Sequence, residues 1–286
     1  MPPTRPSSAP VLTAGSWPES SPARRCAIHQ PNLFPRLSTL AKLFAADTWV
    51  VLDDVQFARR DYQHRARLAA LADPAQQRWL SISTHLPNGR GTLIREARII
   101  EGRRCQRRII HLLHQHYATS PHWLLLHREL TPVVDLIAAT DRTAVIAEAS
   151  TRMLLDLLGW RGQIVRSSDL PAQSERSQRL ADLTAATGAT TYLCGTGGMR
   201  YLNPAPFSEH DITVAPFRIP ASGLWKGGRE ISALRPLMLL GPDALGTALR
   251  TLARTSCRCG SGRPGPCGSD ASGASLRPTS APRRGR

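Results

Sequence analysis

The chain has 286 residues, 41% of them hydrophobic and 20% charged, which is enough for one large domain or two small ones with a substantial core. This length and composition exclude a peptide hormone, a coiled coil and a collagen, and polar residues interrupt every apolar stretch well before the roughly 20 residues of a membrane span. The formal net charge of +16 at first favours a nucleic-acid partner, because basic proteins bind phosphate backbones by releasing counterions.

Much of this positive charge lies at the two ends of the chain. Residues 1–25 contain three Arg and one Glu, and residues 250–286 contain eight Arg and one Asp. Both ends are poor in apolar residues, so we predict a disordered leader over 1–25, one domain over 26–254 and a disordered tail over 255–286. The leader lacks the apolar core of a secretory signal, which predicts a cytoplasmic location.

Strand and helix patterns alternate across the predicted domain. In chain order we expect a strand at 26–30, a helix at 37–46, strands at 48–55, 78–84 and 95–100, helices at about 103–117, 122–139 and 142–158, a strand at 163–168, a helix at 176–187, strands at 191–195 and 212–217, and helices across 230–253. This order predicts an α/β fold in which a mixed sheet has an N-terminal β-α-β unit and a helical middle section.

Polar clusters follow the first two predicted strands. His29, Gln30 and Asn32 come directly after the first strand, and Asp53 and Asp54 end the second. If these strands are parallel, both clusters lie at the carboxyl edge of the sheet, where open α/β sheets bind ligands. The hypothesis for function makes His29, Asp53 and Asp54 catalytic, with one of the two aspartates acting as a general base or metal ligand near His29. The alternative is a helix-capping turn with a chance His, one capping Asp and one Asp paired with an Arg.

An arginine-rich run follows the second cluster. Four Arg occur within the nine residues 59–67, among amides and a tyrosine. Guanidinium groups bind phosphate or carboxylate through two hydrogen bonds, and a tyrosine ring stacks on a sugar or base. A pocket for a phosphorylated or nucleotide-linked small molecule therefore fits better than a nucleic-acid surface. The predicted substrate-binding residues in and before this run are Gln30, Asn32, Gln56, Arg60, Tyr62, Gln63, Arg65 and Arg67.

A glycine-rich loop follows the strand at 191–195. Its Gly195 and Gly197 are also predicted to bind substrate, because glycines after a strand let backbone N–H groups approach an anion. A simple turn explains the loop equally well, since it has neither Walker A nor G-x-G-x-x-G spacing. The histidines on the helix at 103–117 lack a further ligand at a fitting step, so we predict no metal site.

Three cysteines of the predicted tail resemble the start of the SEC-C zinc motif. Cys257 and Cys259 match its Cys-x-Cys-Gly-Ser-Gly start, but the gap to Cys267 is one residue shorter than the usual pattern and Gly268 stands where a fourth ligand is needed. The run is either a weak zinc site or low-complexity sequence without a role, and we favour the second interpretation. The other cysteines are expected to be buried thiols in a reducing compartment: Cys26, Cys105 and Cys194.

The runs IHQPNLFP, VVLDDVQFARRDYQHRARL, WLSIS, TTYLCGTGGMRYL and ITVAPF together resemble the WbqC-like protein family of bacterial polysaccharide and natural-product gene clusters, over about residues 26–250. The positions that match the family pattern are His29, Gln30, Pro31, Asn32, Asp53, Asp54, Gln56, Arg60, Gln63, Arg65 and Arg67. Departures from the pattern are His64 and Ala66 in place of Asn, Tyr62 in place of Trp, and Ser83-Thr84 in place of a strand end with Pro.

The resemblance implies a cytoplasmic transferase that attaches an acyl or aminoacyl group to an amino sugar or small amine, in O-antigen polysaccharide or natural-product biosynthesis. The arginines of 59–67 would hold an anionic nucleotide sugar or acyl or aminoacyl donor, and His29 or Asp53 would remove a proton. One alternative is a metal-dependent glycosyl or nucleotidyl transferase that uses Asp53 and Asp54. Another is a non-catalytic protein that binds a sugar nucleotide or a tRNA, the one nucleic acid that we consider as a partner. The resemblance names no cofactor.

Overall fold

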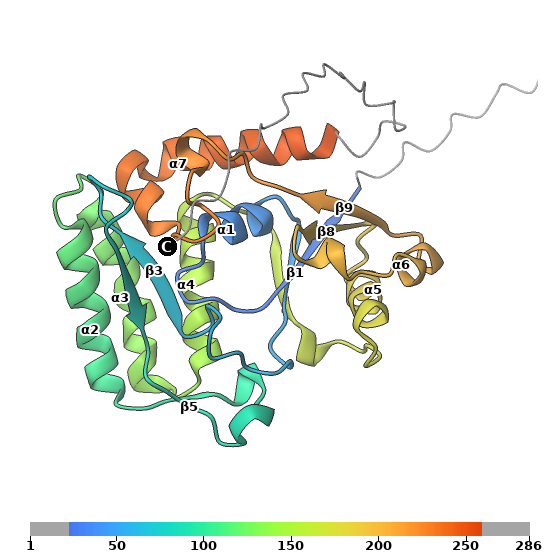
Figure 1. Ribbon diagram of the computed structural model, residues 1–286, viewed down its shortest axis with the longest axis horizontal. Coiled ribbons are helices and arrows are strands. Elements are labelled where there is room, and N and C mark those ends of the chain that lie inside the picture. The colour runs from blue at the N-terminus through green and yellow to red at the C-terminus, as the bar shows by residue number, and fades with distance from the viewer. Residues whose placement is uncertain (1–22, 259–286) are drawn as a thin grey trace, which may run out of the picture.

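The computed structural model describes residues 23–258 (Figure 1). Most of the predicted leader, 1–25, and of the predicted tail, 255–286, lies outside the described residues, as does most of the SEC-C-like run. The last described helix continues past residue 254 and ends at Arg258. Within the described residues, Cys26, Cys105 and Cys194 are free, buried thiols, as predicted.

The central element is a five-stranded parallel sheet with the spatial order β7-β2-β1-β8-β9. The strands are Arg25–His29 (β1), Thr48–Val51 (β2), Gln163–Arg166 (β7), Thr191–Gly195 (β8) and Thr213–Phe217 (β9). Numbered along the chain, they take the spatial order 3-2-1-4-5, so the direction of winding reverses between β1 and β8. That reversal is the topological switch point of a doubly wound sheet, where a crevice opens at the carboxyl ends of the strands.

Alternate residues of the strands pack against helices on opposite faces of the sheet, as the two-residue period of a strand requires. Ala27, Trp49 and Leu193 belong to the larger core, with the helices α1 (Leu37–Phe44) and α7 (Leu234–Arg258). The other face packs against α5 (Arg176–Ala186) and α6 (Ala205–Glu209) through Cys26, Ile28, Val50, Tyr192 and Cys194. In Figure 1, α1 lies beside α7, and α5 lies beside α6.

Between β2 and β7 the chain forms two small antiparallel ribbons and three long helices. The ribbons pair β3 (Arg65–Ala69) with β4 (Gln77–Ser81) and β5 (Thr84–His85) with β6 (Arg98–Ile99). The helices are α2 (Gly102–Tyr117), α3 (Trp123–Ala139) and α4 (Thr143–Leu157), each within a residue of its predicted bounds. The predicted α/β class, β-α-β unit and helical middle section are confirmed. The main sheet is parallel throughout, and the antiparallel pairs of the described chain form separate ribbons.

Two elements differ from prediction. The strand expected at 95–100 is largely a short 3-10 helix, η2 (Ile94–Glu96), and only Arg98–Ile99 pairs as a strand. Strand β2 ends at Val51, and the following carboxylates bind the turn after β7 instead. The helices expected across 230–253 form α7, which is interrupted at Gly241; its φ of 78° suits glycine, and Pro242 follows it.

No helix of residues 23–258 is both long enough and apolar enough to span a membrane.

Candidate functional site

A cavity of about 880 Å³ lies at the switch point of the sheet. Its walls include His29 and Gln30 from the end of β1, residues 194–198 from the end of β8, and residues 217–219 from the end of β9. Helix α1 contributes from one face of the sheet and α5 from the other. The cavity therefore occupies the crevice in which doubly wound sheets bind their ligands.

A second cavity, of about 910 Å³, lies at the opposite, amino edge of the sheet. It is lined by residues that begin or precede the strands, among them Arg25 and Asp47, and it reaches Ala23, the first described residue. His29 and Gly195, which were predicted to be functional, lie at strand ends and line the first cavity, at the carboxyl edge. That cavity is the candidate functional site.

The candidate site is strongly cationic. Its lining includes a single carboxylate, Asp61, and six basic side chains: Arg36, Lys42, Arg176, Arg179, Arg218 and Arg229. Among the described residues only Arg179 of these six has an ion-pair partner, which is Asp54. Five unpaired cations around one concave surface raise the local concentration of anions. The site therefore fits a ligand with several negative charges, such as a diphosphate.

His29 presents a neutral ring to this cavity. Its Nδ1 lies 2.8 Å from the carbonyl oxygen of Gln30. A carbonyl oxygen only accepts, so the neutral ring carries its proton on Nδ1 and keeps a lone pair on Nε2. Burial lowers the pKa of His29 to about 3, and the positive charges of Lys42 and Arg36 add to this effect. At neutral pH His29 is therefore unprotonated, and its Nε2 is a hydrogen-bond acceptor.

Gln30 and Asn32, predicted to bind substrate, lie in different surroundings. Gln30 lines the cavity, and its Oε1 accepts a hydrogen bond of 2.8 Å from Nε2 of the fully buried Gln63. Gln63 thus orients Gln30 from behind the cavity wall. Asn32 is 1% exposed and does not line the cavity. Its backbone carbonyl oxygen accepts a 2.9 Å hydrogen bond from Thr151 Oγ1 on α4. Asn32 therefore fixes the turn after β1 to the helical section.

Asp53 and Asp54, predicted to be catalytic, face the turn after β7. Buried Asp53 accepts hydrogen bonds from Ser167 Oγ at 3.2 Å, Ser168 N at 3.2 Å and Ser168 Oγ at 3.0 Å. Asp54 accepts from Ser167 Oγ and pairs with Arg179. Burial alone would raise the pKa of Asp54, but the hydrogen bonds and the positive charge lower it overall. Neither carboxylate lines the cavity; Asp54 reaches it only through Arg179.

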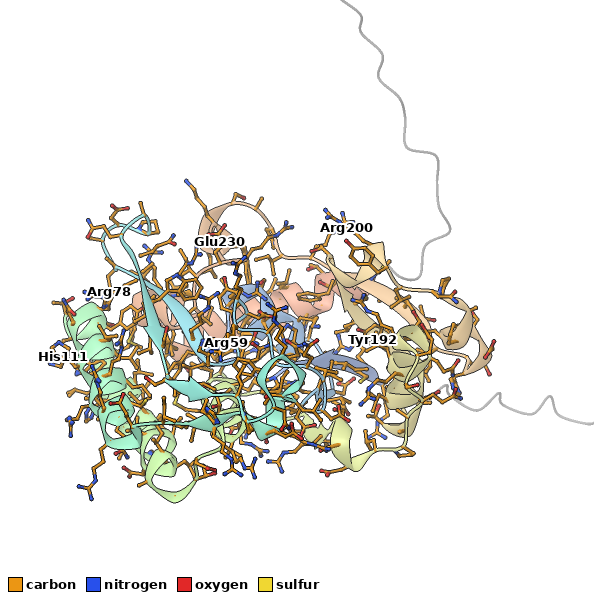
Figure 2. All side chains as sticks on the ribbon, turned by 60° about the horizontal axis from the view of Figure 1, so that its bottom comes forward. Arg59, Arg78, His111, Tyr192, Arg200 and Glu230 are labelled. Carbon is orange, nitrogen blue, oxygen red and sulfur yellow. The ribbon has the colours of Figure 1, made fainter. Side chains whose placement is uncertain are left out.

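Metal-ligand clusters are absent from the described part of the chain. Within residues 23–258, no three His, Cys, Asp or Glu side chains lie close enough together to hold a metal ion. The oxygens of Asp53 and Asp54 already accept hydrogen bonds from serines and an arginine. His111, on the helix whose histidines were considered as metal ligands, is also far from the candidate site. Figure 2 shows it, on α2, at the opposite side of the molecule from Tyr192, a residue of β8 that lines the cavity.

Of the arginines predicted to bind substrate, Arg65 and Arg67 lie on the β3–β4 hairpin and Arg60 lies in the turn before it; none of them lines the cavity. The guanidinium groups of Arg65 and Arg67 lie 4.2 and 4.7 Å from the ring centre of Trp79, a cation–π arrangement. Tyr62 contacts the same ring, with the ring centres 5.5 Å apart, and Arg36 lies 4.2 Å from the centre of the Tyr62 ring. Arg36, which lines the cavity, thus connects it to this stack.

Two more residues predicted to bind substrate, Gln56 and Arg60, lie before the hairpin in the chain. Gln56 is exposed and donates to the backbone carbonyl of Arg90, and Arg60 is exposed and offers its own carbonyl to Arg65. Arg67 also pairs with Glu230 at 2.7 Å. The hairpin is therefore a stacked, hydrogen-bonded support beside the cavity.

Gly195 and Gly197, both predicted to bind substrate, line the cavity together with Gly198. A Cβ atom at Gly198 would lie 2.8 Å from Cys194 Sγ, closer than a carbon and a sulfur can approach, whereas one at Gly197 would meet nothing within 4 Å. Gly198 therefore packs against the sulfur of Cys194 on β8.

We expect Gly198→Ala to lower the free energy of unfolding by about 1–3 kcal/mol, the range for overpacking a filled site. Gly197→Ala, in open space, serves as the matched control and should have little effect. Chemical denaturation measures both, and removing the sulfur in Gly198→Ala/Cys194→Ala should restore most of the loss. Equal stability of the two single variants would contradict the packing.

Sequence reasoning missed the basic residues of the cavity. They come from six separate positions that only the fold brings together, and none forms a local motif. One signal was present: Lys42 and Lys226 are the only lysines of the chain, and Lys42 stands within an apolar helix.

Fold and site together define a doubly wound α/β protein with an anion-attracting cavity at its switch point. The chain belongs to the WbqC-like protein family, whose model matches residues 30–223. It is 23% identical over 227 residues to a protein named "Uncharacterized protein Rv1507c" from Mycobacterium tuberculosis, an alignment that covers 77% of this chain and 96% of that protein. No solved structure matches the chain.

Proposed function

We propose that the protein is a biosynthetic transferase that binds a phosphate-bearing donor in the switch-point cavity and transfers its acyl or aminoacyl group to an amino sugar or another small amine. The observation that carries this proposal is the set of five unpaired cations around one cavity. Polysaccharide or natural-product biosynthesis in the cytoplasm is the setting that we propose for it.

The residues of the cavity can each be given a role in this reaction. The amine nitrogen attacks the acyl carbon, a C–N bond forms, and the bond between that carbon and the donor's leaving group breaks. His29 Nε2 takes the proton that the amine loses, and the arginines hold the departing anion. A bound anion would also offset the charges of Lys42 and Arg36, which raises the pKa of His29 and makes it a stronger base when the donor is present.

The contacts of the two aspartates favour this reaction over the metal-dependent alternative. Asp53 and Asp54 hold the turn after β7 and the side chain of Arg179, and both lie outside the cavity lining. In the proposed reaction Asp54 is a positioning residue, because it acts through Arg179. The cavity also fits a non-catalytic carrier of a sugar nucleotide, which the experiment below distinguishes.

A thermal-shift panel of nucleotide sugars, acyl-coenzyme A thioesters and aminoacyl-nucleotide analogues tests the proposal. A member that binds, present at 100 times its Kd, should stabilise the protein by about 2.7 kcal/mol. The binding donor is then incubated with amino sugars and small amines, and mass spectrometry detects the N-acylated product. We expect His29→Gln to keep donor binding and to lose transfer, with the exposed His111→Gln as control. Donor binding without transfer to any amine would identify a carrier and contradict the transferase.

A further inference from the structure

Lys42 differs from every other basic residue of the cavity. The chain contains 35 arginines and only two lysines, Lys42 and Lys226. Lys42 lies on α1, is 7% exposed and lines the cavity, whereas Lys226 is exposed and directly follows the short 3-10 helix Gly223–Trp225. In a chain that otherwise uses arginine for positive charge, the cavity contains one amine.

No anion balances the buried Lys42. Its Nζ donates a 3.0 Å hydrogen bond to the carbonyl oxygen of Ile28, and no carboxylate among the described residues pairs with it. The titratable and charged groups around it are Cys26 and His29 on β1, Cys194 on β8 and Arg36 before α1. Burial raises the pKa of the Cys26 thiol to about 11 and also raises that of Cys194, so both thiols are neutral near pH 8.

This environment shifts Lys42 towards the neutral amine. Burial lowers the pKa of Lys42 to about 8; Cys194 and Cys26 act in the opposite direction, and the charge of Arg36 adds a smaller lowering. An unpaired buried ammonium costs several kcal/mol, which a leucine or methionine in this apolar helix would avoid. Arginine would keep its charge at any accessible pH, so it could not supply a nucleophile. A desolvated lysine next to another cation is a recognised form of activated amine.

We propose that Lys42 is a nucleophile that forms an imine with a phosphate-bearing aldehyde or ketone in the switch-point cavity. The neutral amine attacks the carbonyl carbon, a C–N bond forms, and the resulting carbinolamine loses its oxygen as water to leave a C=N bond. No oxidant or reductant is consumed. The unpaired arginines of the cavity hold the phosphate. His29, which lines the same cavity, accepts the proton that the lysine nitrogen releases and returns it to the carbinolamine oxygen, which leaves as water.

This reactivity goes beyond the proposed acyl transfer. Acyl transfer to a free amine needs no imine, and an acyl group on Lys42 would form a stable amide. Imine formation at Lys42 and acyl transfer to a free amine can therefore be tested separately.

Reductive trapping of the full chain tests Lys42 directly. The protein is incubated at pH 8 with pyridoxal 5′-phosphate, a phosphate-bearing aldehyde, and borohydride then reduces the imine to a stable secondary amine. Peptide mass spectrometry compares Lys42 with Lys226 in the same molecule. We expect Lys42 to be labelled at least about tenfold faster, because about half of its amine is neutral at this pH, against under about 1% for an ordinary lysine.

Three controls make the outcome specific. Pyridoxal, which lacks the phosphate, should lose most of the preference for Lys42, and inorganic pyrophosphate should slow labelling by pyridoxal 5′-phosphate. Lys226→Arg should leave the Lys42 label unchanged, and Lys42→Arg should abolish it while circular dichroism shows a folded protein. If the wild-type chain is labelled at Lys226 as fast as at Lys42, or faster, the proposal is wrong, whether or not the Lys42 variant folds.

Discussion

The Asp53→Asn variant is expected to lose about 2–4 kcal/mol of unfolding free energy, the range for removing the charge from a buried, hydrogen-bonded carboxylate. Asp53 is 5% exposed and accepts hydrogen bonds from Ser167 Oγ, Ser168 N and Ser168 Oγ. An asparagine of the same shape turns an NH₂ group towards donors, which leaves at least one polar atom without a partner. Urea denaturation followed by circular dichroism measures the loss.

Ser168→Ala is the matched control, because it removes one of these hydrogen bonds and leaves the carboxylate in place. Its loss should be about 1 kcal/mol, the usual value of a single hydrogen bond. The result separates two roles of Asp53. A catalytic aspartate would tolerate asparagine with little change in stability, so an Asp53→Asn variant as stable as the wild type would overturn the structural role.

The order of the elements was predictable because in most of them apolar residues recur at the spacing of a helix or a strand. Strand β8 and the helices α2, α3 and α4 combine apolar residues at strand or helix spacing with clear ends, and tertiary packing uses those same faces. Strand β3 was missed because its sequence, RARLA, alternates arginine with apolar residues. It was interpreted as a charged binding segment, whereas its outward arginines stack on Trp79 of the neighbouring strand.

The candidate site was predictable only where it depends on strand ends. His29, Gln30, Gly195 and Gly197 line the cavity, because the carboxyl ends of parallel strands meet at one edge. The basic residues could not be found in this way. The arginine cluster that is local in sequence, at 59–67, lies on β3 and the turn before it, outside the cavity lining. The cations of the cavity come from helices and loops that only the completed fold brings together.

Removing a cavity arginine is expected to weaken binding of a phosphate-bearing ligand about tenfold for each side chain. A charge-assisted hydrogen bond contributes roughly 1.5–3 kcal/mol, and about 1.4 kcal/mol corresponds to a factor of ten in Kd. Arg36 and Arg218 are suitable because both line the cavity, neither has an ion-pair partner among the described residues, and they precede α1 and follow β9, respectively. Arg36→Gln and Arg218→Gln should therefore act independently, and the double variant should bind about a hundredfold more weakly.

Isothermal titration calorimetry with inorganic pyrophosphate, and with the donor that the thermal-shift panel identifies, measures these affinities. Arg128→Gln is the control, since Arg128 is a 74% exposed arginine on α3, outside the cavity lining. Binding by the wild type should weaken as salt concentration rises, and each cavity variant should show a shallower dependence because fewer charges meet the phosphates. If Arg128→Gln lowers affinity as much as Arg218→Gln, general surface charge attracts the anion and the cavity has no special role. A specific loss in the cavity variants, with the control unchanged, would locate the ligand at the switch point.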